Sequence, residues 1–174
     1  RRCRLRAVVR RSGALALSRA APTGGDPVPR PARWLGMAGL IPFVVPGVAV
    51  WVTTGQLSGL FHTLLIAYAL AIASFMAGAQ WGFGSAAALD DRARLRVLAT
   101  SVVPCLIAWA GVFAPFPWPY AFLLAAFALV LRFDLALVRD GLAPAWYPLL
   151  RLPLTAGVGV ALLSGLLHGV VAGG

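Results

Sequence analysis

The sequence predicts an all-α integral membrane protein with five transmembrane helices. The chain has 174 residues, of which 60% are hydrophobic and only 11% are charged, and its mean hydropathy is +0.86. A soluble domain carries about 25% charged residues, so a soluble globular class is excluded. Because one membrane span needs ~20 apolar residues, the chain has room for five spans and a tail.

The charge pattern predicts the orientation of these spans. The net charge of +10 is carried by arginine alone, since the chain has no Lys and no Glu. All arginines lie in the N-terminal tail, in 84–96 or in 132–151, whereas the turns at 53–59 and 114–119 have none. By the positive-inside rule, we expect the N-terminus inside and the C-terminus outside. The tryptophans predict the same two boundaries, with Trp34, Trp81 and Trp146 inside and Trp51, Trp109 and Trp118 outside.

Residues 1–33 form a separate basic tail that contains prolines. We expect it to be disordered or to act in targeting. Three interpretations remain open: a mitochondrial-type presequence, a tail that lies on anionic lipid, and an upstream extension without a role.

The first span is predicted at 34–52 and contains Pro42 and Pro46. Each proline removes a backbone donor, so we expect a kink whose freed carbonyls find partners inside the bundle. The second span is predicted at 60–82 and carries Gln80 near its inner end. We expect Gln80 to make an interhelical hydrogen bond, with a place on a solute path as the alternative.

The remaining spans are predicted at 97–114, 120–138 and 147–171, and Pro104 should kink the first of these. Small residues repeat every four positions in the second and fifth spans, which favours close helix contact. We expect both ridges to pack within the chain, with a dimer contact as the alternative; they consist of Ser74, Gly78 and Gly82, and of Gly157, Ala161, Gly165 and Gly169.

Five motifs in order resemble the family called domain of unknown function 3429, over about residues 34–170. They are LGMAGLIPF at 35–43, Tyr68 with SFMAGAQWG at 74–82, PCLIAW at 104–109, Asp134, and APAWYPLLRLPLT at 143–155. The resemblance implies a small multi-span protein of bacterial or mitochondrial membranes, and it implies no activity.

Asp134 is the strongest candidate for a site. A carboxylate inside a membrane is costly, so it normally has a partner or marks a pathway. Arg151 should lie at a matching depth across the polar stretch 132–151, and we predict that the two form an ion pair joining the fourth and fifth spans. Arg139 is a competing partner, and a proton or ion path using Asp134 and Gln80 is the alternative.

The sequence carries no pattern that indicates catalysis or a cofactor. His62 and His168 are both predicted at the outer boundary, where they could meet, but a zinc site needs three or four ligands. Ser and Thr residues have no evident activating base. We therefore expect no enzyme, no metal and no cofactor.

The most consistent interpretation is a structural or assembly-type membrane component, and the alternative is a transporter or channel for protons or small solutes. We expect a multi-pass protein of the bacterial inner membrane, with the mitochondrial inner membrane as the alternative. Its expected partners are the bilayer, anionic lipids at the inner face, and a second copy or another membrane complex; we expect no nucleic acid.

Overall fold

The computed structural model describes residues 28–172, and in this range it is helical with no strand. Five helical segments are long and apolar enough to cross a membrane, which confirms the predicted fold class. The elements are α2 (Arg30–Ala38), α3 (Ile41–Val52), α4 (Gly55–Ala86), α5 (Asp91–Ala110), η1 (Gly111–Phe113), α6 (Pro119–Arg139) and α7 (Tyr147–Ala172).

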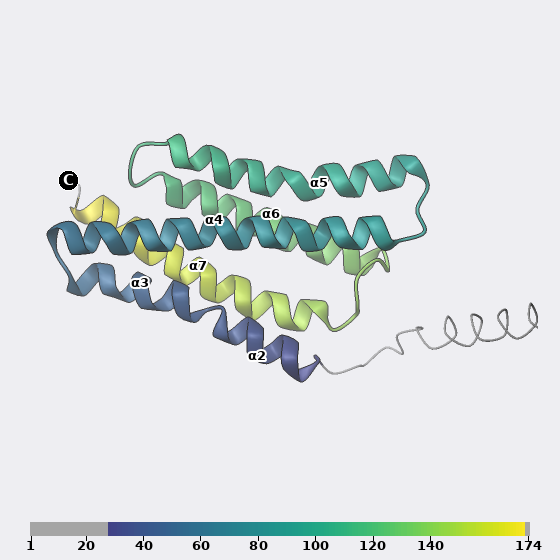
Figure 1. Cartoon of the computed structure of the whole chain (residues 1–174), viewed down its shortest axis with the longest axis horizontal. Helices are drawn as coiled ribbons and strands as arrows, with labels where there is room; N and C mark the ends of the chain where they lie inside the picture. Colours follow the sequence, from purple (N-terminus) through teal and green to yellow (C-terminus); the bar gives the residue numbers. More distant parts are fainter. Residues whose placement is uncertain (1–27, 173–174) are drawn as a thin grey trace, which may run out of the picture.

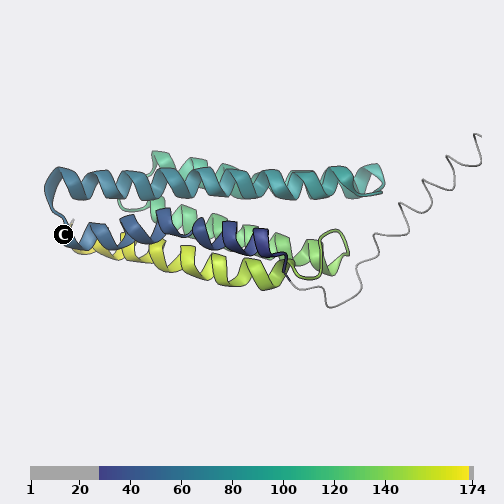
Figure 2. The ribbon, with the colours of Figure 1, turned by 60° about the horizontal axis from the view of Figure 1, so that its bottom comes forward.

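The helices form one bundle in which neighbours in the sequence pack side by side and run in opposite directions (Figures 1 and 2). The pair α3 and α7 closes the bundle, and α4 also packs against α6. Short connections favour this arrangement because they leave consecutive helices adjacent. As a result, the start of α2, the α4–α5 loop and the α6–α7 loop lie at one end, which we call the arginine-rich end.

Helices extend further into the basic stretches than apolarity predicts. The predicted loop 84–96 is reduced to four residues, because α4 continues to Ala86 and α5 begins at Asp91. The Asp90 side chain caps α5 by accepting a hydrogen bond from the Ala93 amide at 2.7 Å. Such a cap satisfies one of the free amides of the first turn, so the helix can begin before the membrane does. Likewise, only 140–146 of the stretch 132–151 lies outside a helix.

The predicted tail 1–33 is also shorter than expected at its C-terminal end. Helix α2 begins at Arg30, with Pro31 in its first turn. Proline suits this position because its missing amide would have no helical partner there. Residues 1–27, which hold most of the predicted tail, lie outside the described residues.

The first span is interrupted at Gly39 and Leu40, and Leu40 lies two residues before Pro42 (Figure 1). Proline at the start of α3 cannot donate to the preceding turn, so α2 ends at Ala38. The Tyr68 hydroxyl of α4 donates to the Gly39 carbonyl at 3.1 Å, which gives one carbonyl at the break a partner inside the bundle. By contrast, α3 and α5 run unbroken through Pro46 and Pro104, so neither interrupts its helix.

We expect Tyr68→Phe to lower the free energy of unfolding by about 1 kcal/mol, because it removes this interhelical hydrogen bond. Unfolding in detergent by titration with dodecyl sulfate measures the change. Tyr147→Phe is the matched control, since the Tyr147 hydroxyl makes no hydrogen bond within 28–172. Equal stability of the two variants would contradict a role of Tyr68 at the break.

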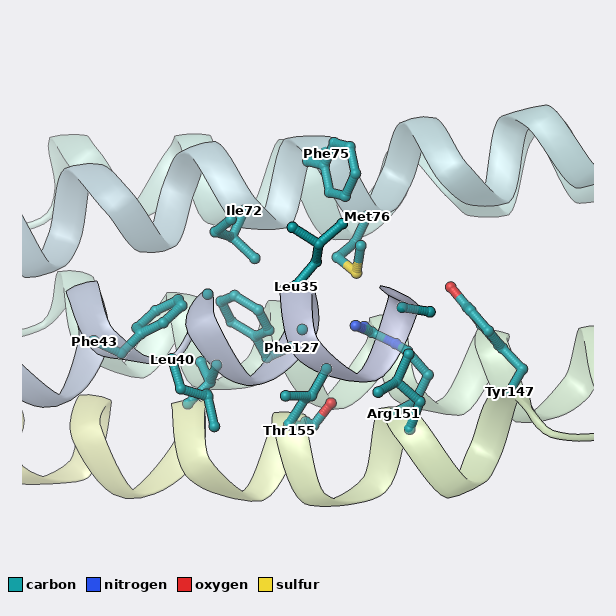
Figure 3. Close-up of a pocket in the computed structure, with 16 residues that line it drawn as sticks. Leu35, Leu40, Phe43, Ile72, Phe75, Met76, Phe127, Tyr147, Arg151 and Thr155 are labelled. Atoms are coloured by element: carbon teal, nitrogen blue, oxygen red, sulfur yellow. The ribbon is translucent and has the colours of Figure 1, made fainter. Parts of the chain in front are cut away.

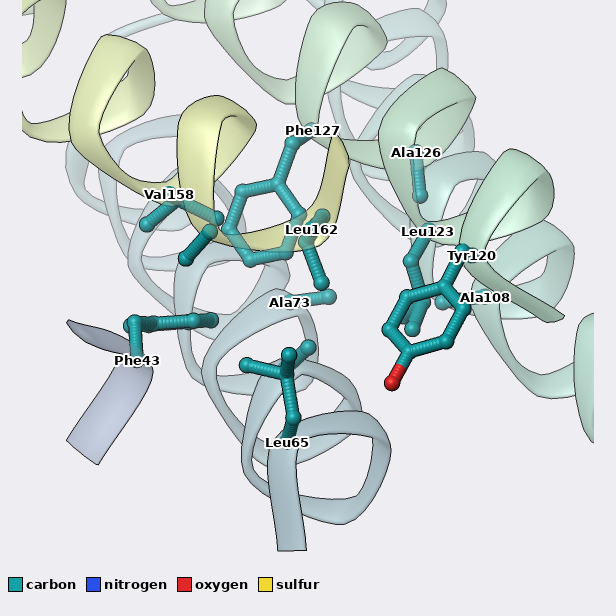
Figure 4. Close-up of a cluster of buried hydrophobic side chains, with 12 residues drawn as sticks. Phe43, Leu65, Ala73, Ala108, Tyr120, Leu123, Ala126, Phe127, Val158 and Leu162 are labelled. Carbon is teal, nitrogen blue, oxygen red and sulfur yellow. The ribbon is translucent and has the colours of Figure 1, made fainter. Parts of the chain in front are cut away.

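The middle of the bundle is apolar. Its buried side chains come from α3 to α7, and Figure 4 shows Leu65, Leu123, Phe127 and Leu162 converging there. This core lies in the middle of the bundle. Sets of buried polar side chains lie on either side of it, toward the two ends of the helices.

The two ridges of small residues behave differently. On α7, a Cβ added to Gly157, Gly165 or Gly169 would come within 3.1 Å or less of Leu40, Tyr120 or Pro117, so this ridge packs within the chain. On α4, Gly78 and Gly82 are exposed and have no atom within 4 Å of an added Cβ. The prediction that both ridges pack internally is therefore wrong for Gly78 and Gly82, because α4 turns the face that carries Gln80 toward α6 instead. Ser74, the third member of this ridge, does contact a neighbouring helix, since its hydroxyl lies 3.3 Å from the Cys105 sulfur of α5.

Candidate functional site

Three polar side chains from three helices meet inside the bundle near the arginine-rich end. Arg151 Nε donates to Asp134 Oδ2 at 2.6 Å. Gln80 Nε2 donates to Asp134 Oδ1 at 2.8 Å and to the Val130 carbonyl at 3.0 Å. Both oxygens of the carboxylate therefore have a donor. We call Gln80, Asp134 and Arg151 the inner layer.

The inner layer lies about one helical turn or more inside its helices. Asp134 is five residues before the end of α6 and Arg151 is the fifth residue of α7. At 1.5 Å per residue both are therefore roughly 6–8 Å from the ends that face the connecting loop. The matching depth lets the two side chains meet across the loop, where the sequence predicts an ion pair.

Burial makes this contact energetically important. Asp134 is 1% exposed, Gln80 1% and Arg151 6%. A lone buried charge is strongly unfavourable, whereas a pair with hydrogen bonds to both partners is tolerated. The Arg151 guanidinium also lies 5.9 Å from the centre of the Tyr147 ring, within range of a cation–π contact.

The competing partner, Arg139, does not reach Asp134. It pairs with Asp140 at 3.6 Å, and both side chains are largely exposed. A separation of five residues places Arg139 and Asp134 on different faces of α6, because facing residues are three or four apart. Exposed pairs of this kind contribute little to stability.

A second set of polar side chains meets at the opposite end of the same three helices. His62 Nδ1 lies 2.7 Å from the Tyr120 hydroxyl, and His62 Nε2 lies 2.9 Å from His168 Nδ1. We call His62, Tyr120 and His168 the outer layer. Within residues 28–172, no group of three or more His, Cys, Asp or Glu side chains lies close enough together to bind a metal ion.

The two layers use the same helices. Gln80 and His62 come from α4, Asp134 and Tyr120 from α6, and Arg151 and His168 from α7. Their separations of 14 to 18 residues correspond to roughly 21–27 Å along the helices. The apolar core fills the space between them.

The contact of Asp134 with Arg151 was predicted from the sequence, and His62 and His168 were placed at the same boundary. The sequence did not predict that Tyr120 joins the two histidines or that Gln80 contacts Asp134. A signal was present in the spacing. Tyr120 and Asp134 are 14 residues apart, and His62 and Gln80 are 18 apart, which are close to whole numbers of 3.6-residue turns. Each pair therefore lies on one face of its helix, and that face turns inward.

Comparisons with known proteins find a matching family model and relatives whose name describes a transmembrane protein. The family model described as "Protein of unknown function (DUF3429)" matches residues 28–167. The chain is 32% identical over 149 residues to Transmembrane protein 69 of Xenopus tropicalis, which is 82% of this chain and 56% of the frog protein. It is 32% identical over 84 residues to the mouse protein of the same name, 48% of this chain and 34% of that protein. The chain thus spans about half the length or less of these relatives, and no solved structure matches it.

Proposed function

The chain belongs to the DUF3429 family of multi-pass membrane proteins of unknown function, and from that premise we propose that it is a structural or assembly-type membrane component. The observation that carries the proposal is the pair of buried polar layers. Each layer joins α4, α6 and α7, one at each end of the bundle.

A structural role is supported by the way in which Asp134 is held. Both of its oxygens accept hydrogen bonds, its charge is balanced by Arg151, and its surface is covered. A carboxylate that carries protons through a membrane needs a chain of partners toward each side. Here an apolar core separates the inner layer from the outer layer, which favours a lock between helices over a relay.

The proposed orientation places the arginine-rich end inside and the C-terminus outside. It is supported by the described arginines, which all lie at that end: Arg30, Arg33, Arg92, Arg94, Arg96, Arg132, Arg139 and Arg151. Loops rich in Arg remain on the cytoplasmic side or its equivalent. The proposed location is the bacterial inner membrane, with the mitochondrial inner membrane as the alternative; the relatives named above are animal proteins.

The proposed partners are the bilayer, with anionic lipids at the arginine-rich end, and a second copy or another membrane complex. The exposed Gly78 and Gly82 on α4 would allow another helix to approach closely. No catalytic activity, metal, cofactor or nucleic acid forms part of the proposal.

The alternative function is a transporter or channel for protons or small solutes. One observation favours it: a cavity of about 750 Å³ lies between α5 and α6 and reaches Gln80, with Arg96, Arg132 and Arg139 among its walls. Gln80 lines this cavity and donates a hydrogen bond to Asp134, so a solute entering there would meet the inner layer.

Reconstitution separates the two functions. The wild-type chain and Asp134→Asn are placed in liposomes that contain a pH-sensitive dye, and the yield of monodisperse protein is measured in parallel. The structural proposal predicts no proton flux above that of empty liposomes and a reduced yield of the variant. Wild-type flux that disappears in a variant of normal yield would overturn it in favour of transport.

A further inference from the structure

A cavity of about 350 Å³ lies beside the interrupted first span, between α2–α3, α4 and α7 (Figure 3). Its walls are mostly aliphatic and aromatic, and include Phe43, Ile72, Phe127, Leu154 and Val158. This volume is within the range of small-molecule sites, which are also largely apolar with a few placed polar groups.

Two polar atoms in the wall have no hydrogen-bond partner among the described residues. They are Arg151 Nη2 and Thr155 Oγ1, and both atoms are buried. Arg151 is only 6% exposed, and Figure 3 shows its nitrogen atoms directed from α7 into the cavity. Residues four apart lie on one face of a helix, so the two groups present adjacent donors. Buried polar groups are nearly always paired, which indicates an acceptor that the chain itself does not supply.

The charge balance restricts this acceptor. Arg151 already has Asp134 as its counter-ion at 2.6 Å, and among the residues that the structure describes it is the only charged one in the wall of the cavity. A carboxylate or phosphate would therefore add an unbalanced negative charge to an apolar site. A neutral carbonyl oxygen would satisfy both donors without that cost.

The position of the donors in the membrane restricts the rest of the ligand. They lie near the arginine-rich end, and the cavity continues along α7 to Val158, roughly 10 Å toward the middle of the bundle. At about 30 Å³ for a group the size of water, it has room for about a dozen methylene-sized groups. Leu35 and Phe75 in its wall are 75% and 68% exposed, so the cavity borders the surface that faces lipid.

We propose that this cavity binds one acyl chain of a glycerolipid from the leaflet at the arginine-rich end. The ester carbonyl accepts hydrogen bonds from Arg151 Nη2 and Thr155 Oγ1, and the chain runs past Leu154 toward Phe43 and Phe127. The site uses donors of Arg151 that the ion pair leaves free, so it does not depend on whether the inner layer is a lock or a path.

The test compares two lipids that differ only in the carbonyl. The delipidated 174-residue chain in detergent is titrated with a diacyl phosphatidylcholine or with its dialkyl ether analogue, and bound lipid is counted by native mass spectrometry. We expect one diacyl lipid per chain, bound about 3- to 10-fold more tightly than the ether, which is the effect of a hydrogen bond. Equal affinity for the two lipids, or no discrete binding of either, would overturn the proposal.

Two matched variants place the effect in the cavity. Thr155→Val should reduce the preference for the ester without loss of stability, because Thr155 Oγ1 has no partner to lose. Thr63→Val, on the exposed face of α4, should retain the wild-type preference. An unchanged preference for the ester in Thr155→Val would contradict the site. A short-tailed benzoquinone, which also carries carbonyl oxygens, serves as a competitor. Displacement of the diacyl lipid by this competitor, at a lower concentration than the lipid needs to bind, would contradict the site as well.

Discussion

Arg151→Gln is expected to lower the free energy of unfolding by about 3–5 kcal/mol, the cost of leaving one member of a buried ion pair without its partner. The variant removes the cation that balances Asp134, which is 1% exposed and has no other charged neighbour in hydrogen-bond range within 28–172. Gln80 remains as a donor, but it carries no charge. Titration with dodecyl sulfate in mixed micelles measures the change.

Arg139→Gln is the matched control, since it makes the same substitution at the same end of the bundle. Arg139 pairs with Asp140 at 3.6 Å, and its side chain is 80% exposed. Exposed ion pairs are worth no more than about 1 kcal/mol. Similar losses in the two variants would show that the effect comes from the net charge of the arginine-rich end and not from the inner layer.

Gly165→Ala is expected to lower the free energy of unfolding by about 1–3 kcal/mol, the usual cost of overpacking a close contact. The added Cβ would lie 2.6 Å from two carbon atoms of the Tyr120 ring. Tyr120 is fully buried and its hydroxyl is held by His62 at 2.7 Å, so the ring has little freedom to move. The substitution should therefore separate α7 from α6 at the outer layer.

Gly159→Ala provides the comparison for this prediction on the same helix. A Cβ at Gly159 has no atom within 4 Å, and alanine forms helices better than glycine by up to about 1 kcal/mol. Gly159→Ala should thus be neutral or stabilising. If the two alanine variants unfold at the same point, the close packing of α7 against Tyr120 has no energetic role.

The class of fold and the number of spans could be predicted from the sequence because membrane insertion depends on local composition. Five apolar runs and the alternating basic loops are properties of short segments. Helix ends were less predictable. Asp90 caps α5 outside the apolar run, and α2 begins within the predicted tail with Pro31 in its first turn, so these ends depend on the residues of the first turn and not on hydropathy.

Which faces turn inward depends on tertiary packing, and the sequence alone was ambiguous there. Gly78 and Gly165 both belong to ridges of small residues, yet only Gly165 contacts another helix. The positions of the buried polar residues would have shown which of the two ridges faces the interior. Gln80 must face the interior, and Gly78, two positions earlier on α4, therefore points elsewhere, because residues two apart do not share a helix face.

The measurement that most directly tests the structural role of the inner layer is a double-mutant cycle on the free energy of unfolding, with Asp134→Asn, Arg151→Gln and the two combined. A lock predicts that each single change destabilises the protein and that the double variant loses little more than either one, since the second substitution removes a charge that the first has already left unpaired. Single changes that leave the stability unaltered, or that add without coupling, would contradict the account and leave Asp134 free for ion or proton handling.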